Sequence, residues 1–109
     1  MNSITKFVSE LVRAANEPEK LTPSEFARLL DRAVVTTVDL RERAGIPSSG
    51  TSRDALVELS AIAYAADEQS NHQRSGALLK AADMIRTLHI VIESGVAIGV
   101  KIVESGKGP

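Results

Sequence analysis

Cysteine and tryptophan are absent from this chain of 109 residues, and aromatic residues make up only 3% of it. Without cysteine the chain can form no disulfide, no thiolate metal site and no cysteine nucleophile. Its core must be aliphatic, and a core rich in alanine and leucine favours closely packed helices. A chain without cysteine also suits a reducing compartment, so we expect a cytoplasmic location.

The chain also lacks a long apolar run and an excess of either charge. Its most apolar stretch, residues 88–103, is interrupted by His89, Glu93 and Lys101 and falls short of the roughly 20 residues that a membrane span requires. Charges near the beginning interrupt the apolar segment that a signal peptide needs. The formal net charge is -1, whereas proteins that bind nucleic acid non-specifically normally carry a basic excess. We therefore expect a globular domain without a membrane partner.

Apolar residues recur at helical spacing in four segments, at about residues 3–16, 23–44, 51–69 and 72–94. Amphipathic segments of this length pack into bundles, with short connections between antiparallel neighbours. The pattern predicts an all-α fold, an antiparallel bundle of about four helices. We expect one helical domain over residues 1–104 and a disordered tail at 105–109.

The second segment has the clearest boundaries in the chain. Thr22 and Glu25 have the spacing of a capping box, and Pro23 stands at the first helical position. Gly45 followed by Pro47 is a common way for a helix to end. No helix breaker lies between these signals, so we predict about six continuous turns.

The third segment is apolar on nearly all sides, and Glu58 is its only charge between residues 55 and 66. Its main apolar stripe consists of Leu56, Leu59, Ile62, Ala63 and Ala66. A second, smaller strip on the far side consists of Val57, Ala61 and Tyr64. Helices with this pattern usually lie centrally, between neighbours on two sides. We expect a central position, in which the second neighbour could belong to another subunit.

The segment at 96–103 is rich in β-branched residues and is compatible with a short strand or with an extension of the last helix. Together with the strip on the third segment it gives more apolar surface than a small core can cover. One interpretation is that this end of the chain folds back over the bundle. The other is a partner interface formed by Val57, Ala61, Tyr64, Val96, Ile98, Val100 and Ile102.

Residues 40–56 resemble the turn and recognition helix of a helix-turn-helix DNA-binding unit. The positions that match the family before and in the turn are Leu40, Ala44, Gly45 and Ile46, and Ser52-Arg53 matches a frequent pair that meets phosphates or bases. The positions that depart from it are Arg41, Thr51 and Asp54, where the family prefers small or apolar residues.

This resemblance implies DNA contacts by Ser52 and Arg53, with Arg41 and Arg43 near the DNA backbone. The alternative is an ordinary loop between two bundle helices, in which Ser52 caps the second helix.

The remaining polar residues form no catalytic or metal-binding pattern. His72 lies four residues after Glu68 and His89 four residues before Glu93. Neither histidine has a second histidine or a Glu-x-x-His partner, as a metal site or a di-iron bundle requires. We expect His72 on the surface and His89 partly buried. No nucleophile elbow or phosphate loop is present either. The sequence predicts no enzyme activity, no cofactor and no metal.

Taken as a whole, the sequence favours a small helical interaction or regulatory module without catalytic activity. Its expected partner is a second copy, as a homodimer, or another helical protein. The alternative function is a DNA-binding transcriptional regulator with a degenerate helix-turn-helix at residues 38–60.

Overall fold

The structure, a computed structural model, describes residues 3–45 and 50–94. In this part of the chain it contains four α-helices, which are α1 (Ser3–Asn16), α2 (Pro23–Ala44), α3 (Gly50–Tyr64) and α4 (Asn71–Ser94). Two short 3-10 helices, η1 (Pro18–Lys20) and η2 (Ala66–Glu68), precede α2 and α4. The expected all-α bundle is confirmed. The segment at 96–103 and the tail at 105–109 lie outside the described residues.

The predicted start and end of α2 are confirmed in atomic detail. The backbone N–H of Glu25 donates to the Thr22 hydroxyl at 3.1 Å, and the Thr22 N–H donates to the Glu25 carboxylate at 2.9 Å. Gly45 ends the helix in the left-handed region with a φ of 75°, where a residue with a side chain would be strained.

The third helix is shorter than predicted, because α3 ends at Tyr64 instead of continuing to about residue 69. At Ala65 the backbone leaves the helical region, and the following 3-10 turn brings Ala66 into the core. A second capping box, formed by Ser70 and Gln73, then starts α4. The sequence pattern Ser-x-x-Gln could have indicated this box.

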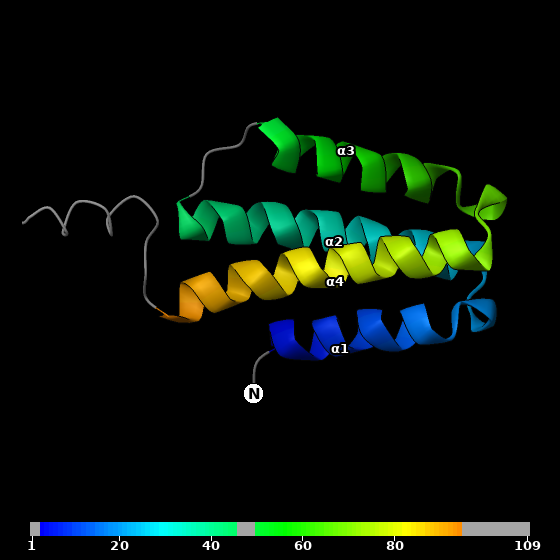
Figure 1. The fold of residues 1–109 in the computed structure, drawn as a ribbon, viewed down its shortest axis with the longest axis horizontal. Helices are drawn as coiled ribbons and strands as arrows, with labels where there is room; N and C mark the ends of the chain where they lie inside the picture. The colour runs from blue at the N-terminus through cyan, green and yellow to red at the C-terminus, as the bar shows by residue number, and fades with distance from the viewer. Residues whose placement is uncertain (1–2, 46–49, 95–109) are drawn as a thin grey trace, which may run out of the picture.

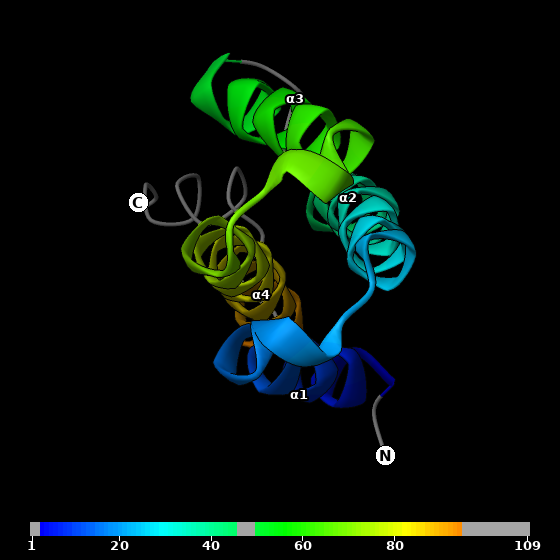
Figure 2. The same ribbon diagram turned by 90° about the vertical axis from the view of Figure 1, so that its right-hand side faces the viewer.

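Successive helices alternate in direction, as Figure 1 shows from the course of the colours along each helix. Viewed from the end, α2 and α4 lie between α3 at one edge and α1 at the other (Figure 2). The closest backbone packing joins α1 to α4, α4 to α2, and α2 to α3. The bundle is therefore flattened, and the parallel pair α2–α4 forms its centre.

The expectation that the third segment is central is wrong, since α4 holds that position and α3 lies at the edge. Three alanines of α4, Ala77, Ala81 and Ala82, are buried and let neighbouring helices approach closely on two sides. Helix α3 packs chiefly against α2 and has little contact with α4. The other described helices therefore cover the apolar surface of α3 on one side only.

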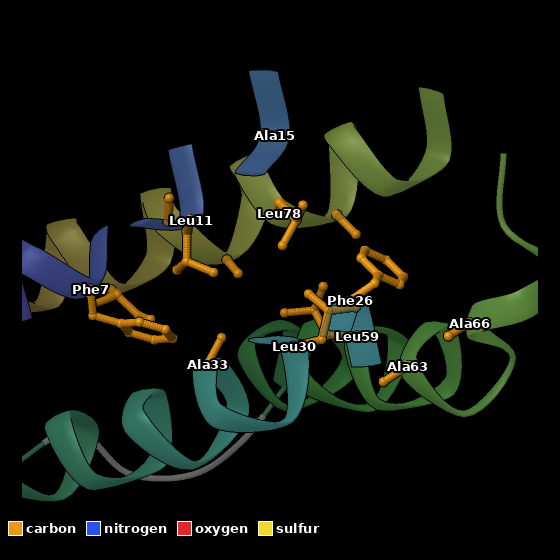
Figure 3. Close-up of a cluster of buried hydrophobic side chains, with 14 of the residues drawn as sticks. Phe7, Leu11, Ala15, Phe26, Leu30, Ala33, Leu59, Ala63, Ala66 and Leu78 are labelled. Carbon is orange, nitrogen blue, oxygen red and sulfur yellow. The ribbon is translucent and has the colours of Figure 1, made fainter. Parts of the chain in front are cut away.

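The core runs through all four helices. Leu11 of α1, Phe26 and Leu30 of α2, and Leu78 of α4 are almost fully buried and meet at its centre (Figure 3). Leu59 is the largest buried side chain that α3 contributes. Aliphatic burial of this kind stabilises by about 25 cal/mol per Å² of apolar surface removed from water.

Candidate interaction surface on α3

The face of α3 that points away from α2 is apolar. Steps of about 100° per residue place Val57, Ala61 and Tyr64 within an arc of about 60°, opposite the buried Leu59. Val57 is 60% exposed, Tyr64 is 95% exposed, and Ala61 between them is also exposed. We call these three residues the outer strip.

Little charge accompanies the outer strip. Glu58 is the only charged residue between Ala55 and Tyr64, and its carboxylate accepts a hydrogen bond from the Lys80 ammonium at 2.7 Å. This ion pair connects α3 to α4 at a point where the two helices otherwise have little contact. The carboxylate is therefore partly neutralised from within the chain, and the outer strip itself remains uncharged.

The outer strip is the part of the predicted partner interface that the structure describes. The other predicted interface residues, Val96, Ile98, Val100 and Ile102, lie outside the described residues. Whether the two sets of residues form one surface therefore stays a prediction.

The residues predicted for DNA binding do not form a basic surface in the described part. Arg41 is only 7% exposed and packs into the end of the bundle, so its guanidinium is not presented to a phosphate. Arg43 is exposed, and its guanidinium lies 3.2 Å from the Asp39 carboxylate, an ion pair typical of a helix surface. Ser52 and Arg53 stand in the first turn of α3, and their side chains lie outside the described residues.

The arrangement of α2 and α3 also differs from that in a helix-turn-helix. In that motif the two helices cross at about 90–120°. Here α3 runs antiparallel to α2 and lies alongside it, as both views of the fold show (Figures 1 and 2). This is the geometry of two neighbouring antiparallel helices in a bundle.

Two shallow grooves lie at the sides of α1. One, of about 270 Å³, lies between α1 and α2 and includes Glu10, Arg28 and Arg32 in its lining. Arg32 is held there by the Phe7 ring, 4.1 Å below its guanidinium carbon, and by Glu10 at 3.5 Å. The other groove, also about 270 Å³, lies between α1 and α4. Both grooves are open and mix apolar with charged residues, including the ion pairs Arg32–Glu10 in the first and Arg86–Asp83 in the second.

The histidines are located as the sequence suggests. His72 is exposed in the first turn of α4. The His89 side chain is 19% exposed, and its Nε2 lies 3.5 Å from the Glu93 carboxylate one turn later. Among the residues that the structure describes, no three histidine or carboxylate side chains are grouped as a metal site would require.

No helix within residues 3–45 and 50–94 has both the length and the apolar character needed to cross a membrane.

Several apolar residues that the sequence pattern did not identify as part of an exposed surface are exposed in the structure. Val35 and Val38 project from the outer side of α2, and Leu79 lines the groove between α1 and α4. Val35 is 68% exposed, which is close to the value for Val57. Single exposed valines are common on globular proteins and indicate no function by themselves. Val35 is instead useful as a control for Val57 in experiments.

Comparison of the chain with known protein families, with curated proteins and with solved structures finds no match.

Proposed function

We propose that this protein is a small helical interaction module that associates with a second copy of itself through the outer strip on α3. The observation that carries the proposal is that, among residues 3–45 and 50–94, helix α3 is packed on one side only, while its opposite side exposes Val57, Ala61 and Tyr64. An uncovered apolar helix face without unpaired charge is a common feature of helix–helix interfaces. Most oligomers of identical chains have twofold symmetry, so a dimer is the expected product.

The expected association is weak, because the outer strip is small. Burying a valine or a tyrosine contributes about 1.5–3 kcal/mol before the cost of joining two molecules is subtracted. Tyrosine adds a large, rigid surface with one polar atom, a combination that is favoured at interfaces. Dissociation constants in the micromolar to millimolar range are consistent with these contributions to the free energy of association.

The experiment is sedimentation equilibrium of the full chain over about 10–500 µM, a range that covers weak dimers. We expect the average mass of the wild-type protein to rise from that of a monomer toward that of a dimer. Val57→Asp and Tyr64→Asp should each abolish this rise, because a buried unpaired carboxylate opposes association. Val35→Asp introduces the same charge at an equally exposed valine on α2, so it should leave the rise unchanged.

Two results would contradict the proposal. A wild-type protein that stays monomeric across the whole range has no self-association to explain. Equal loss of association in Val35→Asp and Val57→Asp would show that added charge alone, and not the outer strip, is responsible. Circular dichroism of each variant checks that the helices are intact.

A further inference from the structure

Ala65 marks the junction between α3 and η2, and the chain is attached to the bundle differently on its two sides. On one side, α3 packs chiefly against α2. On the other side, η2 is joined to both α2 and α4. We propose that α3 swings partly away from the bundle about Ala65, while η2 and the other three helices stay packed. This motion is separate from the proposed self-association and takes place in the single chain.

The described residues attach α3 to the bundle by few contacts. Two of its described side chains, Leu59 and Ala63, are buried. Apart from the ion pair between Glu58 and Lys80, α3 has little contact with α4. The side chains of this pair are 59% and 45% exposed, so solvent and salt screen their attraction. Opening α3 therefore uncovers a small part of the core and breaks one weak ion pair.

The turn that follows Ala65 is held more firmly. Ala66 is only 6% exposed and belongs to the core. Its carbonyl oxygen accepts a hydrogen bond at 3.4 Å from the guanidinium of Arg74, which also donates to the Leu21 carbonyl at 2.9 Å. Because Arg74 is buried in α4, it joins η2 to the central helix and to the connection before α2. Moving η2 would break these bonds, whereas moving α3 alone leaves them intact.

The backbone of Ala65 provides the pivot. Its N–H donates to the carbonyl of Ala61 at 3.1 Å and so continues α3, whereas its carbonyl accepts from the N–H of Glu68 at 2.9 Å and so belongs to the turn. Between these two bonds lie only φ and ψ of Ala65, at -103° and 38°. Rotation about them moves α3 without breaking either bond, as expected of a hinge at the end of an element.

The covalent connection at the other end of α3 limits the motion. Residues 46–49 join Gly45 of α2 to Gly50 of α3, and a chain of this length spans at most about 18 Å. The opened state is therefore a partial separation of α3 from α2. It exposes the inner face of α3, which carries Leu59 and Ala63, to small reagents in solution.

Thiol labelling tests the position of the hinge, since the natural chain has no cysteine and every introduced thiol reports one position. Ala63→Cys and Ala66→Cys are a matched pair, because both alanines are 6% exposed in the same core cluster and lie on opposite sides of Ala65 (Figure 3). Ala81→Cys, in α4 and 0% exposed, reports opening of the whole bundle. Each full-length variant is treated with excess iodoacetamide at about 0.1 µM protein, where weak self-association does not occur.

We expect Ala63→Cys to be labelled at least about tenfold faster than Ala66→Cys, because local opening is far more frequent than unfolding of the whole bundle. Ala66→Cys and Ala81→Cys should be labelled at similar, slow rates. Circular dichroism and urea denaturation of each variant check that the added sulfur leaves the bundle folded.

The ion pair gives a second measurement. Adding Lys80→Gln to Ala63→Cys should raise its labelling rate about twofold to threefold, the effect of removing a screened surface pair. The same substitution should leave Ala66→Cys unchanged. Arg86→Gln removes another exposed ion pair of α4, with Asp83, and should alter neither rate.

Three results would overturn the inference. Equally fast labelling of Ala63→Cys and Ala66→Cys means that η2 moves with α3, so Ala65 is not the hinge. Equally slow labelling of both together with Ala81→Cys means that the bundle opens only as a whole. A labelling rate of Ala63→Cys that Lys80→Gln leaves unchanged means that α3 does not separate from α4. Because all rates are measured on the monomer, failure of the proposed self-association in sedimentation would leave these results unaffected.

Discussion

Arg74 brings a positive charge into the interior of the bundle, where it is only 8% exposed. Its guanidinium donates to the carbonyl oxygens of Leu21 at 2.9 Å and Ala66 at 3.4 Å, and lies over the Phe26 ring. Among the described residues no carboxylate neutralises it. One side chain thus joins the connection before α2 to the connection before α4, at the same end of the bundle.

Replacing this arginine should weaken the fold. We expect Arg74→Ala to lower the free energy of unfolding by about 2–3 kcal/mol, because two carbonyl groups lose a charged donor and Phe26 loses a packed neighbour. Urea denaturation measures the change. Arg86→Ala removes only an exposed ion pair with Asp83 and should cost less than about 0.5 kcal/mol. Equal losses in the two variants would show that Arg74 has no special structural role.

At the scale of the helices, the sequence predicts which helices form and where they end better than it predicts how they pack against one another. The boundaries of α2 follow from side chains close in sequence, Thr22, Glu25 and Gly45, which act on their own backbone. The early end of α3 is followed by a 3-10 turn in which Ala66 is buried, and such tertiary contacts are not visible in the sequence pattern. The central position of α4 depends on which of its faces carry alanine where neighbouring helices come closest. The periodicity of apolar residues alone does not predict where those close approaches occur.

The same distinction applies to the candidate surface. Helical spacing identified Val57, Ala61 and Tyr64 as a second apolar face, and the structure locates them in solvent. The sequence could not show that Arg41 is buried, because an arginine near a helix end is usually exposed and its burial is decided by neighbouring helices.

The edge position of α3 predicts that it is the least stably held of the helices that pack on α2. It buries Leu59 and Ala63 against one neighbour, whereas α4 buries residues against two. We expect amide hydrogens in α3, such as that of Ala63, to exchange at least about tenfold faster than those of Leu78 and Ala81 in α4. Native-state hydrogen exchange at dilute, monomeric concentrations measures this. Equal protection in both helices would mean that the bundle opens only as a whole.

For the molecule as a whole, self-association and stability are linked. A partner that binds only the folded chain stabilises it, so unfolding of a dimer depends on protein concentration. Each tenfold increase in concentration adds about 1.4 kcal/mol per dimer, or about 0.7 kcal/mol per chain. For a domain of this size, that corresponds to a rise in Tm of about 3 °C.

Calorimetry at low and high concentration should therefore show a rising Tm for the wild-type protein once most chains are paired. The Tyr64→Asp variant should keep the same Tm at both concentrations, because its charged α3 face cannot be buried against a second copy. Val35→Asp, which alters an exposed residue of α2, should behave like the wild type. A wild-type Tm that does not change while sedimentation reports dimers would mean that the copies join through parts of the chain that remain associated after the bundle unfolds. In that event, the outer strip of α3 would not be the surface that couples folding to association.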